Sequence, residues 1–129
     1  MLKFFDYFKK YQKNKNNLLV IFGAGVIGRL TFEALKEKNI KVNYFCDSDK
    51  RKQTEFENIK IISPNDLDKL DKNTDIFHCT QYFNSVIPFL KNKGFKNFYK
   101  SSDLLSSIDI EKIYKGSLPS IKINRYIEF

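Results

Sequence analysis

The sequence contains few of the residues on which disulfide-rich or zinc-stabilised small proteins depend. Its 129 residues include two cysteines, Cys46 and Cys79, one histidine and no tryptophan. The cysteines form neither a Cys-x-x-Cys pair nor a His/Cys cluster with metal-ligand spacing. A disulfide framework and a structural metal site are therefore excluded as the basis of the fold. We expect two reduced, buried thiols instead.

Long apolar segments are also missing. No run approaches the roughly 20 apolar residues that a membrane-spanning helix requires. The N-terminal residues lack the basic region, the apolar stretch and the small-residue cleavage site of a signal peptide. The sequence therefore predicts no membrane span and a cytoplasmic location.

Arginine is scarce, although the chain is basic. The net charge is +8 at pH 7, yet 20 of the 23 basic residues are lysines, and the arginines are Arg29, Arg51 and Arg125. Recognition of nucleic acids favours the arginine fork and a clustered basic face. The lysines are scattered along the chain, so we expect no nucleic-acid partner.

The length fits one domain, and 42% of the residues are apolar, which is enough for a packed core. Apolar residues at helical spacing between Leu2 and Tyr11 predict an amphipathic N-terminal helix that packs on the domain or on a second copy. We divide the chain into this helix and its linker (1–16), a nucleotide-binding domain (17–105) and a C-terminal extension (106–129).

Within the domain, short apolar runs alternate with helical patterns. The expected strands are residues 18–22, 41–46, 59–62, 75–80 and 95–99, and the expected helices follow the first, third and fourth of them. Pro88 places the start of the last helix near Asn84 or kinks it. This pattern predicts a three-layer α/β, Rossmann-like domain with a five-stranded, mainly parallel sheet of order 3-2-1-4-5, preceded by the extra N-terminal helix.

The start of one short helix has a local signature. Ser63 is suited to the N-cap, Pro64 to the first helical position, and Asp66 can return a hydrogen bond to the cap residue. We therefore expect a capping box before the helix that ends near Leu70.

The main candidate site is the loop Gly23-Ala24-Gly25-Val26-Ile27-Gly28, which follows the first strand and opens a helix. In this motif Gly23 permits the tight turn, Gly25 lets the backbone approach a pyrophosphate, and Gly28 lets the helix pack on the strand. The helix N-terminus presents N–H groups and a positive dipole end to phosphates. Arg29 is expected to add a charged fork.

An acidic turn, Asp47-Ser48-Asp49, follows the second strand, and Asp47 lies 19 residues after Gly28. Such a carboxylate accepts hydrogen bonds from a ribose diol and repels a 2′-phosphate, which favours NAD over NADP. Ser48 and Thr80, at the ends of their strands, complete the expected set. A bland polar turn is the alternative, and two carboxylates alone are weak grounds for a metal site.

His78 lies near the end of the fourth expected strand, where a ligand is within reach. A structural histidine is the more common outcome in such a position. No serine or cysteine shows a recognisable arrangement with a base and its orienting residue, so nucleophilic catalysis is unsupported and no catalytic residue is assigned.

The segments "LLVIFGAGVIGRL", "VNYFCDSDK", "IKIISPNDL" and "QYFNSVIPFLKNKGFKNFY", in this order, resemble Rossmann-like domains of bacterial polysaccharide biosynthesis. Such domains precede nucleotide-sugar dehydratases and sugar acetyltransferases and are attached to some methyltransferases. The resemblance covers residues 17 to about 105. It implies that Gly23, Gly25, Gly28 and Asp47 face NAD(P) or a nucleotide-sugar diphosphate, and it implies binding rather than a reaction.

The leading hypothesis is a nucleotide- or dinucleotide-binding module of surface-carbohydrate biosynthesis without a complete catalytic site. The expected cofactor is NAD or NADP, with NAD favoured and a nucleotide-sugar as the alternative. One alternative function is an NAD-dependent oxidoreductase or a nucleotide-sugar epimerase or dehydratase, completed by a homodimer or by a further catalytic domain. The other is a protein-interaction domain with a vestigial glycine loop.

Overall fold

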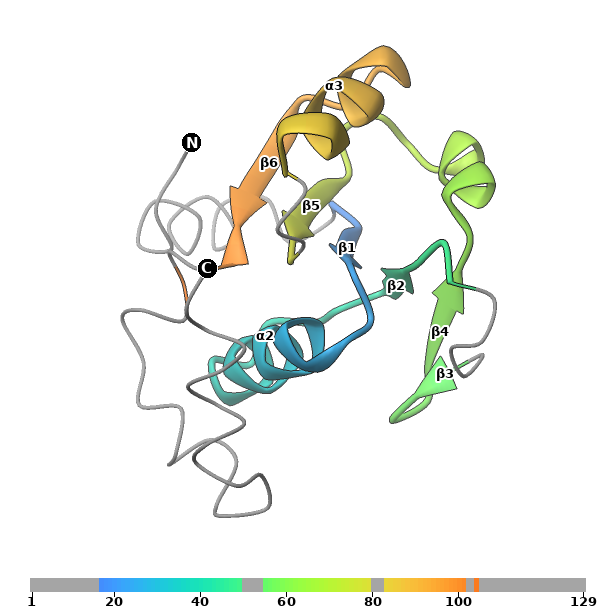
Figure 1. Cartoon of the computed structure of the whole chain (residues 1–129). Coiled ribbons are helices and arrows are strands. Elements are labelled where there is room, and N and C mark those ends of the chain that lie inside the picture. Colours follow the sequence, from blue (N-terminus) through green and yellow to red (C-terminus); the bar gives the residue numbers. More distant parts are fainter. Residues whose placement is uncertain (1–16, 50–54, 80–82, 102–103, 105–129) are drawn as a thin grey trace.

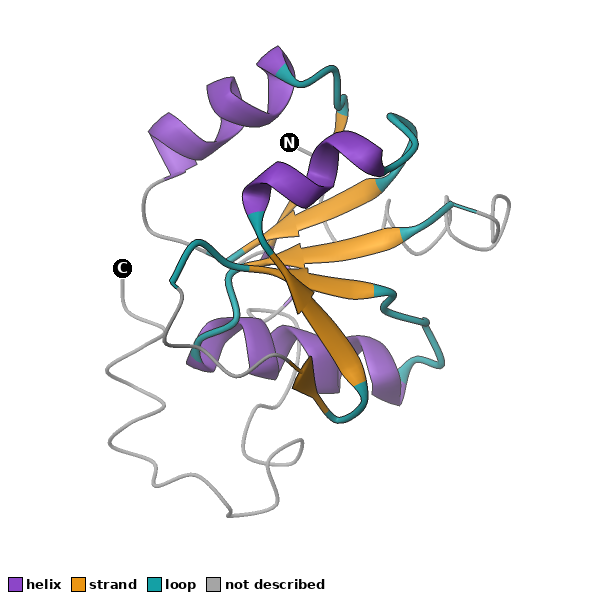
Figure 2. Cartoon of the chain, turned by 90° about the vertical axis from the view of Figure 1, so that its right-hand side faces the viewer, coloured by secondary structure: helices purple, strands orange, loops and turns teal. Residues whose placement is uncertain are grey.

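The computed structural model describes residues 17–49, 55–79, 83–101 and 104. They form a six-stranded sheet, and helices cover both of its faces (Figures 1 and 2). In chain order the elements are β1 (Leu19–Phe22), α2 (Val26–Glu37), β2 (Tyr44–Cys46), β3 (Glu55–Phe56), β4 (Ile59–Ile62), η1 (Pro64–Lys69), β5 (Asp75–His78), α3 (Phe83–Asn92) and β6 (Asn97–Lys100). The prediction of an α/β domain with a mainly parallel sheet is confirmed. The expected N-terminal helix and the C-terminal extension (106–129) lie outside the described residues.

The prediction of five strands is wrong. The strand order is β3-β4-β2-β1-β5-β6, and β3 pairs antiparallel with β4 whereas the other pairs are parallel. The order therefore differs from the expected 3-2-1-4-5 by this added edge strand. Glu57 and Asn58 join β3 to β4 with φ of 48° and 67°, the positive values that a tight hairpin turn needs. A strand of two residues is too short to produce a period-2 pattern, so the sequence did not indicate it.

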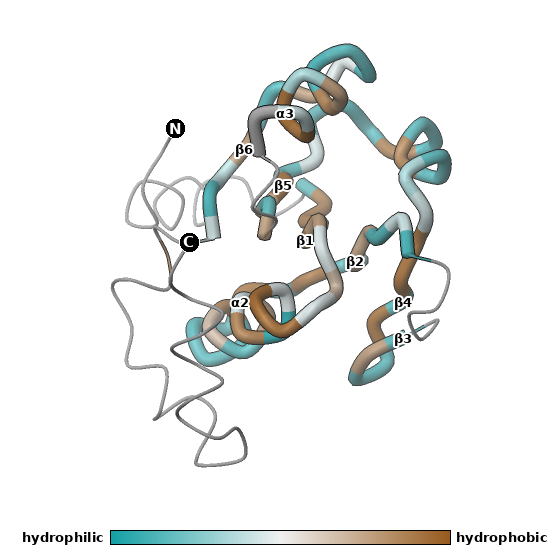
Figure 3. Tube along the Cα trace, viewed as in Figure 1, coloured by the Kyte–Doolittle hydropathy of each residue, from teal (hydrophilic) through white to brown (hydrophobic). Residues whose placement is uncertain are grey.

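The central strand, β1, pairs with β2 on one side and with β5 on the other. Leu19, Val20 and Ile21 are at most 1% exposed. A parallel strand covered on both faces is expected to consist of such a continuous apolar run. In Figure 3 β1 is coloured mainly as hydrophobic, whereas hydrophobic and hydrophilic residues alternate along α2.

Successive residues of β1 belong to two separate cores. Ile21 packs in a cluster with Leu30 and Leu35 of α2, whereas Val20 packs with Leu67 of η1 and Leu90 of α3. The alternation follows from the two-residue period of a strand. Figure 2 shows the result, with α2 on one face of the sheet and η1 and α3 on the other.

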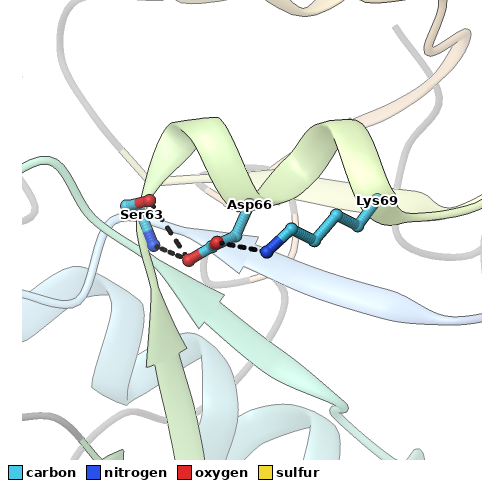
Figure 4. Close-up of polar contacts among 3 residues, drawn as sticks. All are labelled: Ser63, Asp66 and Lys69. Carbon is cyan, nitrogen blue, oxygen red and sulfur yellow. Dashed lines mark hydrogen bonds and ion pairs between the residues drawn. The ribbon is translucent and has the colours of Figure 1, made fainter.

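The capping box before η1 is confirmed, although η1 is a 3₁₀-helix. The backbone N–H and the hydroxyl of Ser63 both donate to Asp66 Oδ2, over 3.2 and 3.1 Å (Figure 4). Lys69 Nζ lies 3.4 Å from the other carboxylate oxygen. The hydrogen bonds from Ser63, followed by the bond and charge of Lys69, hold the pKa of Asp66 below its ordinary value. Ser63 and Asp66 thus define where η1 begins.

Pro88 lies inside α3, which runs from Phe83 to Asn92 without interruption. The chain leaves α3 through Gly94, whose φ of 98° suits glycine after a helix C-terminus. None of the helices in the described ranges has the length and apolar character needed to cross a bilayer.

Candidate functional site

The glycine loop leaves the carboxyl end of β1, in the middle of the sheet. From β1 the chain runs to β2 on one side, and it later returns to β5 on the other side. Ligands of open α/β sheets bind outside the carboxyl ends of the strands at such a reversal of strand order. The loop therefore occupies the position in this fold where a small-molecule ligand is expected.

Two of the loop glycines are required by close packing and backbone conformation. Gly23 has φ of 114°, a conformation that residues with a side chain rarely adopt. A Cβ on Gly28 would overlap the carbonyl oxygen of Gly23. Because Gly28 carries no side chain, the first turn of α2 lies directly against the start of the loop.

The N-terminus of α2 presents backbone amides at this edge of the sheet. Gly25 is the N-cap residue, no described side chain caps the helix, and the first helical hydrogen bond runs from Arg29 N to Gly25 O over 3.0 Å. The amides of Val26, Ile27 and Gly28 precede that bond and so have no acceptor within the helix. The first turn of α2 contains no acidic residue. The helix dipole therefore favours an anion here.

Asp47 is bonded to the loop itself. Its Oδ2 accepts the N–H of Ala24 at 2.8 Å, and its Oδ1 accepts the N–H of Asp49 at 2.8 Å. The neighbouring amide of Gly23 donates to Cys46 O over 2.7 Å. The turn after β2 thus fastens the first two loop residues, a contact that the sequence pattern did not predict.

The remaining expected site residues take different positions. The Arg29 guanidinium lies over the ring of Phe56, 4.5 Å from its centroid, and so contacts the β3–β4 hairpin. Ser48 is exposed in the acidic turn, and Thr80 lies outside the described residues. His78 is 2% exposed within β5. The structure therefore brings Asp47 to the glycine loop and directs Arg29 to the hairpin.

A polar cluster beside the loop had no sequence signal. The thiol of Cys79 lies 2.8 Å from Ser101 Oγ and 3.6 Å from Thr31 Oγ1, and the Thr31 hydroxyl donates to Ile27 O over 2.7 Å. Burial raises the pKa of Cys79 to about 11, although the bonds from Ser101 and Thr31 oppose the shift. The thiol is therefore protonated at neutral pH and is no nucleophile.

Cys46 is buried in β2, as predicted, and Cys79 is half-buried. Burial, with smaller contributions from the charges of Asp47 and Asp66, raises the pKa of Cys46 to about 12. Cys46 is the last residue of β2 and Cys79 follows β5; these strands lie on opposite sides of β1, which places the two cysteines about 10 Å apart. That separation is too long for a disulfide without backbone movement.

Comparisons with known proteins give one family match. Residues 15–96 match the family described as C2185-like, N-terminal. A search among curated proteins gave no match. Among solved structures, the chain is similar to the acetyltransferase domain of PglB from Neisseria gonorrhoeae FA1090 in complex with acetyl coenzyme A, with 21% identity and a TM-score of 0.49. The match covers 63% of this chain and 42% of that chain, and it concerns the fold alone.

The expected cofactor is corrected by this comparison. The sequence predicted NAD or NADP, with a nucleotide-sugar as the alternative, whereas the similar solved domain holds acetyl coenzyme A. The preference for NAD was inferred from Asp47, and that carboxylate is bonded to Ala24 and Asp49. Neither dinucleotide is retained as the ligand.

Proposed function

The chain belongs to the C2185-like, N-terminal family, and we propose that it binds a small molecule other than NAD or NADP by a phosphate or diphosphate group on the loop Gly23–Gly28. The observation that supports this proposal is the group of three amides at Val26, Ile27 and Gly28, which precede the first helical hydrogen bond at the carboxyl edge of the sheet. Backbone amides at a helix N-terminus bind phosphates through hydrogen bonds and the helix dipole.

The packing of the loop supports the same proposal. Gly28 lies against the Gly23 carbonyl, so the amides of the first turn belong to a rigid corner between β1 and α2. Donors held rigidly before the ligand arrives bind an anion without an entropic cost of ordering. The loop is therefore suited to binding a phosphate group in a fixed orientation.

We further propose that the chain positions its ligand and lacks a complete catalytic site of its own. In the described part of the chain the two thiols have raised pKa values, and His78 is buried within the sheet. The resemblance of residues 17–105 to domains of polysaccharide biosynthesis supports a place for this binding in surface-carbohydrate synthesis.

The test is calorimetric titration of the full chain with pyrophosphate, ADP and UDP. Val26→Pro removes one proposed donor, and proline is tolerated at the first position of a helix. Gly25, which precedes it, has φ of −83° and ψ of −159°, a conformation compatible with a following proline. Val26→Ala is the matched control, because it changes the side chain and keeps the amide.

We expect at least one of the three ligands to bind the parent and Val26→Ala alike. Val26→Pro should bind it at least tenfold more weakly, since a hydrogen bond to a charged group contributes about 1.5–3 kcal/mol. Far-UV circular dichroism would verify that both variants fold. Equal binding by the two folded variants, or no binding by the parent, would refute the proposal.

A further inference from the structure

The first two amides of the glycine loop are already bonded within the protein. Gly23 N donates to Cys46 O over 2.7 Å, and Ala24 N donates to Asp47 Oδ2 over 2.8 Å. Both acceptors belong to β2 or the residue that follows it. By contrast, the amides of Val26, Ile27 and Gly28, in the first turn of α2, have no acceptor within the helix.

The carboxylate of Asp47 is itself held in place. Its second oxygen accepts the N–H of Asp49 over 2.8 Å, and the Asp47 backbone N–H donates to Ile62 O over 3.0 Å. Charge-assisted bonds from backbone amides are among the stronger hydrogen bonds in proteins. Asp47 therefore reaches Ala24 from a rigid turn that is anchored on β4.

We propose that Asp47 is the positioning residue of the glycine loop and that it withholds the Ala24 amide from the ligand. The inference rests on the proposed function and adds the extent of the anion site. The anion contacts Val26, Ile27 and Gly28 and stops short of Ala24, because a carboxylate and a phosphate cannot share one N–H and repel each other at short range. Asp47 thereby limits how close to Ala24 the phosphate group can bind.

One arm of the test needs no ligand. In the ¹⁵N-labelled full chain, hydrogen exchange at Ala24 is measured by NMR in the parent, Asp47→Ala and Asp47→Asn. Exchange at Ala24 should be about tenfold faster in Asp47→Ala, since a charge-assisted hydrogen bond is lost. Asp47→Asn keeps an acceptor oxygen, so exchange at Ala24 should be nearly as slow as in the parent. This variant also allows the measurement to be made if Asp47→Ala does not fold.

Asp71 offers a matched control. Its Oδ1 accepts the N–H of Asn73 over 2.7 Å, the same local geometry as at Asp47. This turn, however, precedes β5 and so lies at the amino ends of the parallel strands, at the edge of the sheet opposite the glycine loop. Asp71→Ala removes one carboxylate charge and one hydrogen bond from the amide two residues later, as Asp47→Ala does. Exchange at Ala24 should stay as in the parent.

The second arm adds pyrophosphate. In the parent, the amide signals of Val26, Ile27 and Gly28 should shift and that of Ala24 should not. In Asp47→Ala, the amide signal of Ala24 should shift as well. Pyrophosphate should bind this variant about tenfold more tightly, because one N–H donor is freed and one negative charge is removed. Unchanged Ala24 exchange in Asp47→Ala, or an Ala24 shift in the parent equal to the others, would overturn the inference.

The two arms separate this inference from the proposed function. If no loop amide of the parent responds to pyrophosphate, ADP or UDP, the proposed function fails. Faster Ala24 exchange in Asp47→Ala would still support Asp47 as the residue that positions the loop. If the amides of α2 respond while Ala24 exchange is unaffected by Asp47→Ala, the proposed function stands and the role of Asp47 is refuted.

Discussion

Gly28 decides whether the loop can pack against the first turn of α2. A methyl group at this position would overlap the Gly23 carbonyl oxygen, which is backbone and cannot rotate away. Gly25, in the same loop, has φ of −83°, a value open to any residue. The two glycines are therefore expected to differ in their tolerance of a side chain.

Gly28→Ala should lower the free energy of unfolding by about 3 kcal/mol, since overpacking against rigid backbone forces the loop or the helix to move. Gly25→Ala should cost about 1 kcal/mol or less, the usual cost of alanine at an N-cap. Urea denaturation followed by circular dichroism measures both. Equal losses would show that the close contact at Gly28 is not what requires glycine there.

Cys46 makes stability depend on pH in the alkaline range. Its pKa is raised from 9.0 to about 12 in the folded chain. Above pH 9 the unfolded chain releases the thiol proton and the folded chain retains it, so the free energy of unfolding falls as pH rises. The contribution is complete below pH 9 and is lost between pH 9 and about 12.

The loss attributable to Cys46 should be about 1.4 kcal/mol per pH unit in this window. Urea denaturation of the parent and of Cys46→Ala, at pH 8 and at intervals up to pH 11, isolates this thiol from the lysines and tyrosines that both proteins share. The pH dependence should be less steep in Cys46→Ala. Parallel curves would mean that the thiol ionises alike in the folded and unfolded chains.

At the scale of elements, the β3–β4 hairpin is held to α2 by aromatic contacts. The ring of Phe56 lies 5.6 Å from that of Phe32 and 5.7 Å from that of Phe45, in edge-to-face geometry. Arg29 covers the same ring. A two-residue strand has little stability of its own, so these contacts attach it to the domain.

Phe56→Ala should lower the free energy of unfolding by about 3 kcal/mol, because it removes the apolar area of the ring together with its aromatic and cation–π contacts. Phe89 is the control, since this residue is 40% exposed and its ring contacts Lys93 Nζ in a cation–π pair. Phe89→Ala should cost less than about 1 kcal/mol. Thermal or urea unfolding compares the two, and similar losses would contradict the role given to Phe56.

For the whole molecule, burial predicts a gradient of local stability across the sheet. β1 is paired on both sides and packed on both faces, whereas β3 has two residues and one neighbour among the described strands. Local openings expose weakly packed edges more often than the centre of a sheet.

Hydrogen exchange should therefore be slowest for amides of β1 such as Val20 and Ile21, which should exchange only through global unfolding. The amides of β3 should exchange much faster through local opening. Exchange followed by NMR or mass spectrometry measures this order. Protection at β3 equal to that at β1 would show that the sheet opens as a single unit.

Much of this arrangement was predictable from local signals. The bounds of β4, the apolar run of β1 and the capping box at Ser63 and Asp66 depend on neighbours within a few residues, and the structure has them as expected. Spacing within one strand or one helical turn is set by backbone geometry. For this reason the amino-acid sequence alone determined the type of most elements and the position of the glycine loop.

Contacts between distant residues were decided only by the tertiary structure. Asp47 accepts a hydrogen bond from Ala24, the Arg29 guanidinium lies over the ring of Phe56, and the Cys79 thiol is hydrogen-bonded to Ser101. A carboxylate, a guanidinium or a thiol has many acceptable partners, and the choice depends on which strands become neighbours. The sheet order, with its added edge strand, brought these side chains together, and no spacing along the chain encodes that choice.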